Sequence, residues 1–309
     1  MKKRCFEWLL TAFLVVGCTK NAKNTDFPVQ RFDTDFYRYI NAELPIDSLQ
    51  KYNPFLNDYR ERVMDDFSDS TLMQMYRDEQ TILADISGLQ KEIVSGMEIL
   101  LLHFPDLRQP EIYLHVSGWN YRVVAGENYV SLSADYYLGA DYPLYQSYFY
   151  EYQLSQMTPE RMAPDLFLGF LMSEFPFKGN ESVLLDKMLY EGKLRYILSK
   201  LLPKRKIWEY VGYTPEEYNW SKDNESRIWK TILEKKQLFT SDYLTTMQYF
   251  RDAPYTSALP VESPAKIGIL IGYQIVTNYM KQHPKTTWNE LMNQEDHLLF
   301  LKESKYRPK

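Results

Sequence analysis

Apolar residues recur at helical spacing over much of the chain, interrupted by prolines and acidic turns. Residues 47–77 contain short helical patterns that break at Pro54 and near Asp69. A longer amphipathic helix is predicted over 81–104, because apolar residues recur every three or four positions and Pro105 follows. The apolar positions of this helix are Ile82, Ile86, Leu89, Ile93, Met97 and Leu100.

A different pattern follows this helix. Glu111–Ser117 and Tyr129–Ala134 are rich in β-branched and apolar residues, which is typical of strands. Gly118 and Gly126 stand where turns are needed. We therefore predict a small sheet near the middle of the chain, which ends in the stretch 135–141.

From Pro159 onward the pattern is helical throughout. Thr214 is a strong helix start, because Pro215 would occupy the first helical position and two glutamates follow in the first turn. No linker rich in Gly, Ser or Pro divides the chain. We predict an α+β fold, mostly helical, as a single domain over 27–309 with a small central β-sheet. The other predicted helices are 164–175, 181–202, 264–282 and one or two within 287–301.

The first residues read as an export signal. Lys2, Lys3 and Arg4 precede an almost wholly apolar stretch, Trp8–Val16, which is far shorter than the roughly 20 residues of a membrane-spanning helix. Small residues lead directly to Cys18, a pattern that resembles the bacterial lipobox. We therefore expect a lipoprotein signal peptide over 1–17, fatty acylation of Cys18 and a flexible tether over 18–26. The alternative is an ordinary signal peptide with an incidental cysteine.

Charge and cysteine content narrow the possible partners. Removal of residues 1–17 takes away three of 36 bases and one of 41 acids, which leaves a net charge of −7. Such an acidic balance without a basic block argues against nucleic acid. The acyl chains of Cys18 are therefore expected to anchor the protein in the lipid bilayer. Because Cys5 is removed with the signal, the mature chain has no disulfide and no thiolate cluster for zinc.

Five stretches of the chain carry a resemblance to known proteins: Arg31–Asp33, Tyr129–Tyr145, Asp186–Lys193, Ser263–Met280 and Ser304–Lys309. Together they resemble the gliding-motility lipoprotein GldB family of Bacteroidetes. The resemblance implies a periplasm-facing lipoprotein whose partners are envelope or gliding-machinery proteins, although similar chains occur in species that do not glide. The tether has no Asp directly after Cys18 and no acidic run of the kind that directs surface export, so we expect the periplasmic face of the outer membrane.

The order of strands and helices also resembles the zincin peptidases, and GldB-like chains are similar to predicted zinc proteases. Those enzymes place an H-E-x-x-H motif on a helix and a third metal ligand on a later helix. The corresponding helix here, 164–175, contains no histidine. Glu174 and Glu191 remain as possible relics of the base or the third ligand. The resemblance therefore implies a degenerate zincin-like pseudoenzyme, with no catalytic residues, no metal and no cofactor.

Four other residues, of types that serve in catalysis or metal binding elsewhere, have plain structural explanations. His115 lies in a strand pattern, where a solvent-facing or hydrogen-bonded structural histidine is expected rather than a ligand. His103 precedes a helix end, where an imidazolium favours the helix dipole. Asp135 and Asp141 flank a turn and are able either to hold a cation through oxygen ligands or simply to form the turn.

Two glycines mark the last long helix. Gly268 and Gly272 lie one turn apart, and each costs roughly 1 kcal/mol relative to alanine inside a helix. Their presence suggests close approach of another backbone. Packing within the domain is the favoured explanation over the docking of a partner.

Three functions are therefore considered. The leading one is a non-catalytic scaffold or binding component of a cell-envelope machine. The second is a metal-dependent or carboxylate hydrolase with a non-standard site around Glu174 and Glu191. The third is a lipoprotein that binds peptide or glycan in an aromatic-rich cleft. Neither a serine-nucleophile elbow nor a glycine-rich phosphate loop is present.

Overall fold

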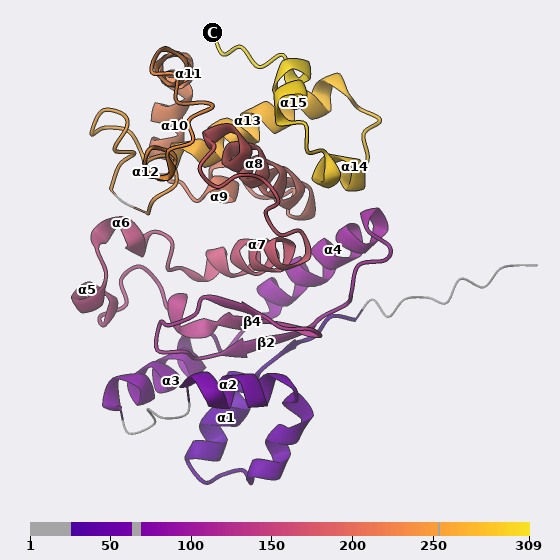
Figure 1. Cartoon of the computed structure of the whole chain (residues 1–309). Helices are drawn as coiled ribbons and strands as arrows, with labels where there is room; N and C mark the ends of the chain where they lie inside the picture. The colour runs from indigo at the N-terminus through magenta and orange to yellow at the C-terminus, as the bar shows by residue number, and fades with distance from the viewer. Residues whose placement is uncertain (1–25, 64–68, 253) are drawn as a thin grey trace, which may run out of the picture.

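The computed structural model describes residues 26–63, 69–252 and 254–309. The predicted signal peptide, Cys18 and nearly all of the predicted tether lie outside these ranges. Within them the chain is mostly helical with one small sheet, so the predicted α+β class is confirmed. The layers are stacked: N-terminal helices lie below the sheet, two helices lie above it, and the C-terminal helices form the top (Figure 1). Among the described helices none is both long and apolar enough to cross a bilayer.

Four short strands form the sheet, in the order β1-β2-β4-β3. The parallel strands are β1 (Val29–Gln30), β2 (Glu111–His115) and β4 (Tyr129–Ser133), whereas β3 (Val123–Ala125) runs antiparallel to β4 at one edge. Apart from Glu111, every residue of β2 and β4 is buried. Burial on both faces is expected of parallel strands covered by helices on either side.

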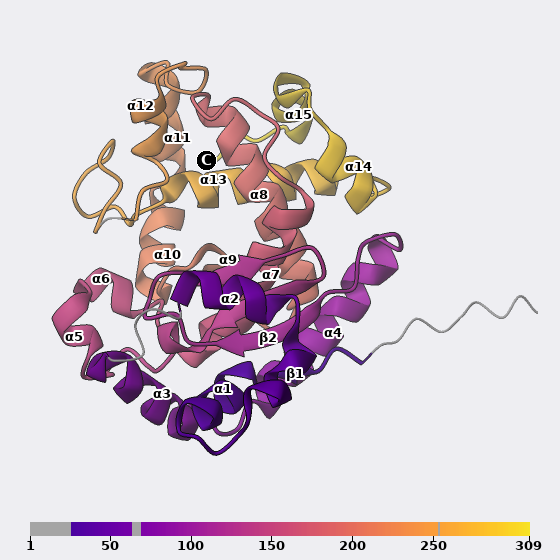
Figure 2. The ribbon, with the colours of Figure 1, turned by 60° about the horizontal axis from the view of Figure 1, so that its bottom comes forward.

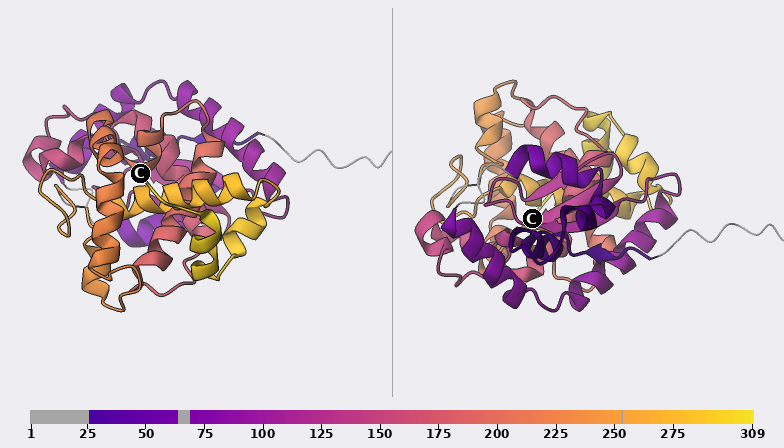
Figure 3. Two further views of the ribbon diagram at one scale, coloured as in Figure 1. Left: turned by 90° about the horizontal axis from the view of Figure 1, so that it is seen from above. Right: turned by 90° about the horizontal axis from the view of Figure 1, so that it is seen from below.

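The lower face of the sheet is covered by α1 (Phe32–Ile40), the 3-10 helix η1 (Ile46–Tyr52), α2 (Phe55–Val63) and α3 (Ser70–Ile82). Seen from below, these helices lie across the strands (Figure 3). Aromatic rings fill this layer, and Phe32 is in edge-on contact with three of them, as such rings prefer. The three partners of Phe32 are Tyr52, Phe55 and Tyr59.

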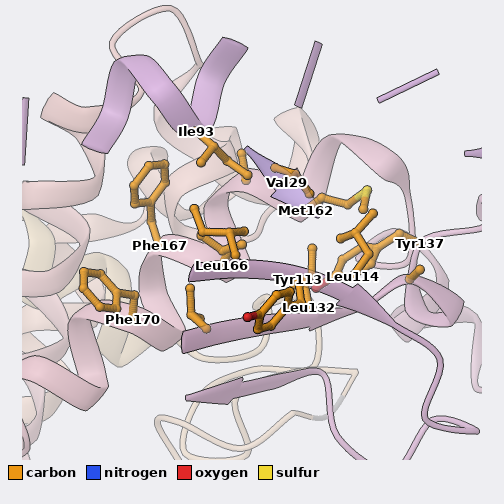
Figure 4. Close-up of a cluster of buried hydrophobic side chains, with 14 of the residues drawn as sticks. Val29, Ile93, Tyr113, Leu114, Leu132, Tyr137, Met162, Leu166, Phe167 and Phe170 are labelled. Atoms are coloured by element: carbon orange, nitrogen blue, oxygen red, sulfur yellow. The ribbon is translucent and has the colours of Figure 1, made fainter. Parts of the chain in front are cut away.

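The upper face is covered by α4 (Ser87–His103) and α7 (Met162–Glu174). Leu166 of α7 lies directly over the central strands (Figure 4). Phe167 fits against α4 at Gly96, where an added Cβ would lie 2.3 Å from the phenyl ring. Between β4 and α7 the chain forms short segments: η3 (Ala134–Tyr136), α5 (Tyr145–Tyr148), α6 (Glu151–Leu154) and η4 (Pro159–Arg161).

The top layer is built around α8 (Leu184–Leu201) and α13 (Ile267–Gln282), which cross each other (Figure 2). Thr214 caps α10 as predicted, because its hydroxyl accepts the Glu217 N–H. The remaining helices of this layer are α9 (Ile207–Val211), α10 (Pro215–Asp223), α11 (Glu225–Glu234), α12 (Tyr243–Met247), α14 (Trp288–Asn293) and α15 (His297–Ser304).

Glycines bring α8 and α13 into backbone contact. A Cβ added to Gly272 would lie 1.8 Å from the carbonyl oxygen of Met188, and one added to Gly192 would lie 2.3 Å from Gly272. Gly268 makes room for a different neighbour, the ring of Phe250, which an added Cβ would approach to 2.7 Å. The expectation that these glycines serve packing within the domain is confirmed.

Several predicted helix starts were wrong, and two strands were not predicted. Helix α7 begins at Met162 and not at Pro164, and α8 begins at Leu184 and not at Glu181. The helix predicted from Thr81 begins only at Ser87, because α3 ends at Ile82 and the Asp85 carboxylate accepts the Ser87 N–H in a turn. The final long helix begins at Ile267 and not at Pro264. Strands β1 and β3, of two and three residues, were not predicted, because such short segments carry too little alternation to be recognised.

Candidate functional site

A cavity of about 740 Å³ lies between the sheet edge, α7, α8 and the start of α13. From α7 it is lined by Asp165, Leu168, Gly169 and Met172, which lie on one helix face because they are three or four residues apart. The volume is within the range of small-ligand pockets. The cavity lies between α7, which covers the upper face of the sheet, and the helices of the top layer.

Helix α8 contributes a row of charged side chains to the opposite wall. Lys187, Glu191 and Arg195 are spaced by four residues and therefore share one face of the helix. Arg195 donates from Nη1 to Glu191 at 3.0 Å, which satisfies this carboxylate. Glu191 is thus an ion-pair partner, as a purely structural acid would be.

Asp165 is the centre of a second ion-pair group. It accepts hydrogen bonds from Arg161 at 2.7 Å, from Arg122 at 3.1 Å and from the hydroxyl of Tyr137 at 3.0 Å. Burial disfavours ionisation of Asp165, but the charges of Arg161 and Arg122 outweigh it, so the pKa of this carboxyl is lowered from its ordinary value. Asp165 is therefore a fixed anion and not a proton donor.

Two arginines of the cavity are incompletely satisfied. The Nε atoms of Arg161 and Arg195 are buried, and neither has a hydrogen-bond partner within the described ranges. Burial also lowers the pKa of Arg195 from its ordinary value, against the attraction of Glu191. A buried arginine that lacks partners for several donors is costly unless another group supplies acceptors.

Positive charge dominates the lining of the cavity. Lys266 is paired with Asp252 at 3.1 Å, but Lys187 has no carboxylate partner in the part of the chain that the structure describes. Its ammonium group instead lies 5.6 Å from the ring centre of Phe250. In total, five cationic side chains face three carboxylates, although the whole chain has a net charge of −5.

Glu174 and Glu191 do not share a site. Glu174 ends α7 and pairs with Arg108, which also donates to the carbonyl oxygens of Gly126 and Glu127. It lines a separate cavity of about 640 Å³, in which Glu191 has no part. A hydrolase that uses both carboxylates together would therefore need a different arrangement from the one observed.

The residues considered for metal binding do not gather. No group of three or more histidine, cysteine or acidic residues suited to a metal exists within the described ranges. Asp135 is fully buried and Asp141 is exposed, so the two flank the turn without facing one site. The Asp135 carboxylate instead accepts the backbone N–H groups of Ser117 at 3.2 Å and Trp119 at 2.8 Å.

Arg31 and Asp33, which belong to the family resemblance, form a partly buried ion pair at 2.8 Å, in which Asp33 is fully buried. Glu79 approaches the same guanidinium at 2.8 Å. Burial and the neighbouring Asp33 raise the pKa of Glu79 well above its ordinary value. One arginine thus balances two acids of which one retains its proton, which indicates a structural role for this motif.

The two histidines predicted as structural are so. His103 ends α4 and stacks on Trp288, with ring centres 3.8 Å apart. His115 is buried, and its Nδ1 shares a hydrogen bond of 2.6 Å with the Ser131 hydroxyl. Of the two expectations for His115, the hydrogen-bonded one is confirmed and the solvent-facing one was wrong, because helices cover both faces of β2.

His115 is expected to make the fold sensitive to acid. Burial lowers the pKa of His115 to about 3, whereas the ordinary value is 6.5. Between these values the unfolded chain binds a proton that the folded chain does not, so stability falls as the pH falls. From pH 6.5 to 4.5 the wild type should lose about 2–3 kcal/mol more than His115→Gln in urea unfolding.

The exposed His103 supplies the matched control for this measurement. His103→Gln removes an imidazole but leaves His115 in place, so it should keep the acid sensitivity of the wild type. Equal losses in the wild type and in His115→Gln would show that the buried imidazole does not govern this pH range.

The profile of one protein family matches residues 18–308, and that family is described as gliding motility protein GldB. No curated protein and no solved structure gave a match to the chain. The matched range covers nearly the whole sequence, including all the residues that line the cavity.

Proposed function

Because the chain belongs to the GldB family of gliding-motility lipoproteins, we propose that it is a non-catalytic scaffold or binding component of a cell-envelope machine. Acyl chains on Cys18 would anchor it to the outer membrane, with the folded domain facing the periplasm. Its partners would then be other envelope or gliding-machinery proteins.

The lining of the cavity supports the absence of catalysis. An H-E-x-x-H motif needs two ligand positions one turn apart on a helix, and a third ligand from a second helix. Asp165 and Gly169 of α7 are one turn apart and both line the cavity, as Glu191 of α8 does. These positions, at the spacing that two imidazole ligands would need, carry an aspartate and a glycine.

The glycine position leaves no room for a ligand. A Cβ at Gly169 would lie 2.5 Å from a methyl group of Val123, so an imidazole there would require the sheet edge to move. Asp165 and Glu191 are each neutralised by arginine. Two acids that are already paired, without imidazole or thiolate, make a poor zinc site. This is the observation that carries the proposal.

Metal analysis and a peptidase assay test the proposal. The mature lipoprotein, extracted in detergent from its own membranes, is expected to contain far less than one zinc per chain and to leave a panel of peptides intact. Crosslinking in intact cells is expected to join it to envelope proteins. Stoichiometric zinc whose removal by a chelator abolishes peptide cleavage would contradict the proposal and favour the hydrolase.

The carboxylate hydrolase without metal is less well supported. Such an enzyme needs one acid that holds a proton and one that is ionised. In the cavity, Asp165 is ionised by two arginines and Glu191 is paired with a third. Binding of a ligand, the third function considered for this sequence, is compatible with the same lining.

A further inference from the structure

We propose that the cavity between α7, α8 and the sheet edge binds a small organic acid, whose carboxylate is held by Arg195, Lys187 and Arg122. This inference rests on the proposed function only in treating the cavity as a place of binding and not of catalysis.

The first argument is the supply of unused donors. Arg195 has five N–H donors and, among the described residues, makes one hydrogen bond, to Glu191. Arg122 likewise makes one, to Asp165. The ammonium group of Lys187 has three N–H donors and makes no hydrogen bond within the described ranges, although the residue is half-buried. A carboxylate in the cavity would accept from all three.

The second argument is charge. Each of the three carboxylates that line the cavity already has a cationic partner: Asp165 has two arginines, Glu191 has Arg195 and Asp252 has Lys266. A cation would therefore meet no free acid. An anion would meet the unpaired charge of Lys187 and the remaining N–H donors of Arg195, and the concave shape of the site focuses this positive field.

The third argument is the apolar part of the wall. Leu168 and Met172 of α7 lie on one side, and Phe250 and Ile269 lie on the other. A bare inorganic ion would leave this surface without contacts. A carboxylate attached to an apolar or aromatic body would satisfy both halves of the cavity, as small-ligand sites generally do. Arginine suits the carboxylate because its planar fork matches two oxygens.

Lys187→Met is the most informative change, because it removes a charge and leaves no carboxylate without a partner. Arg122→Met is a second variant, since Asp165 keeps Arg161 and Tyr137. The matched control is Lys200→Met on the same helix. Lys200 is exposed, lies 4.9 Å from the ring centre of Tyr196 and is outside the cavity.

N-acetyl-L-phenylalanine and its neutral amide are the probes, titrated into the detergent-extracted mature protein at constant ionic strength. The acid is expected to bind saturably and the amide at least about tenfold more weakly, because a charge-assisted hydrogen bond contributes about 1.5–3 kcal/mol. Lys187→Met and Arg122→Met should each weaken binding of the acid about tenfold, and Lys200→Met should not change it.

Three results would each overturn the inference. The first is equal binding of the acid and the amide, and the second is equal affinity of Lys187→Met and the wild type for the acid. The third is no saturable binding of the acid at 10 mM or below, which is about the weakest affinity that a three-donor site would give. Unchanged thermal unfolding of Lys187→Met without probe shows that a loss of binding is not a loss of fold. The zinc and peptidase assays are separate measurements. Detected catalysis would contradict the proposed function, whereas the anion site is tested by the probe titrations alone.

Discussion

Gly272→Ala is expected to destabilise the protein by about 3 kcal/mol or more, the largest effect predicted for so small a change. The added methyl group would lie 1.8 Å from the Met188 carbonyl oxygen and 2.6 Å from its carbonyl carbon. Both are backbone atoms, so relief requires α8 and α13 to separate. Separation would expose the hydrophobic core of the top layer, in which Leu185 and Met188 of α8 pack with Ile271 and Ile275 of α13. Urea unfolding followed by tryptophan fluorescence measures the loss.

Gly88→Ala is the matched control for this prediction. Gly88 is also helical, in the first turn of α4, but an added Cβ there meets nothing within 4 Å. Alanine lowers the entropy of the unfolded chain and is a better helix former, so this variant should be unchanged or more stable by up to about 1 kcal/mol. A cost of less than about 1 kcal/mol for Gly272→Ala would contradict the close helix contact.

These glycines show which part of a helix contact can be predicted from the sequence. The four-residue spacing of Gly268 and Gly272 predicts that another backbone approaches one face of the helix. It does not say which segment approaches. The partner is α8, where Gly192 lies opposite Gly272. A contact between residues so far apart in sequence depends on how the whole chain folds, which a local pattern does not contain.

The sheet was predicted in part for a similar reason. Strands β2 and β4 are long enough to show an apolar, β-branched pattern, and their parallel pairing buries both faces. Strand β1 has two residues and exists because Val29 pairs with Ile112. Strand β3 is fixed by pairing with β4 and by the contact of Val123 with α7. Both are defined by neighbours and not by their own residues.

The cationic cavity could not be predicted from the sequence at all. The spacing of Lys187, Glu191 and Arg195 does indicate one face of a helix. Nothing in the order of residues, however, brings that face toward Arg122 at the sheet edge and Arg161 before α7. The acids predicted as relics of a catalytic site included Glu174, but this residue lines another cavity and pairs with Arg108.

Asp135→Ala is the second change with a large expected effect, because this side chain holds a strained turn together. Gly118 and Trp119 both have left-handed backbone conformations, with φ of +62° and +63°. Such a conformation is unfavourable for tryptophan and persists only when its surroundings fix it. The Asp135 carboxylate fixes the turn by accepting the N–H groups of Ser117 and Trp119 and the hydroxyl of Ser133.

Removal of that carboxylate would leave the backbone N–H groups of Ser117 and Trp119, in the turn after β2, without acceptors. Each such group costs about 1–3 kcal/mol, so the expected loss in urea unfolding is about 3–5 kcal/mol. Asp135→Asn retains one acceptor oxygen and should lose less. The indole of Trp119 donates to the Asp135 carbonyl oxygen at 2.9 Å. In Asp135→Ala this indole should become more mobile, and its fluorescence should be red-shifted at urea concentrations below the main unfolding transition.

Asp141→Ala separates this structural role from a cation site. Asp141 is exposed, and its replacement should change stability by no more than about 0.5 kcal/mol. If the two acids held a cation together, calcium would stabilise the wild type, and either replacement would abolish that effect. We expect no calcium-dependent shift in any of the proteins, because the Asp135 oxygens are occupied by N–H and hydroxyl donors that a cation would have to displace.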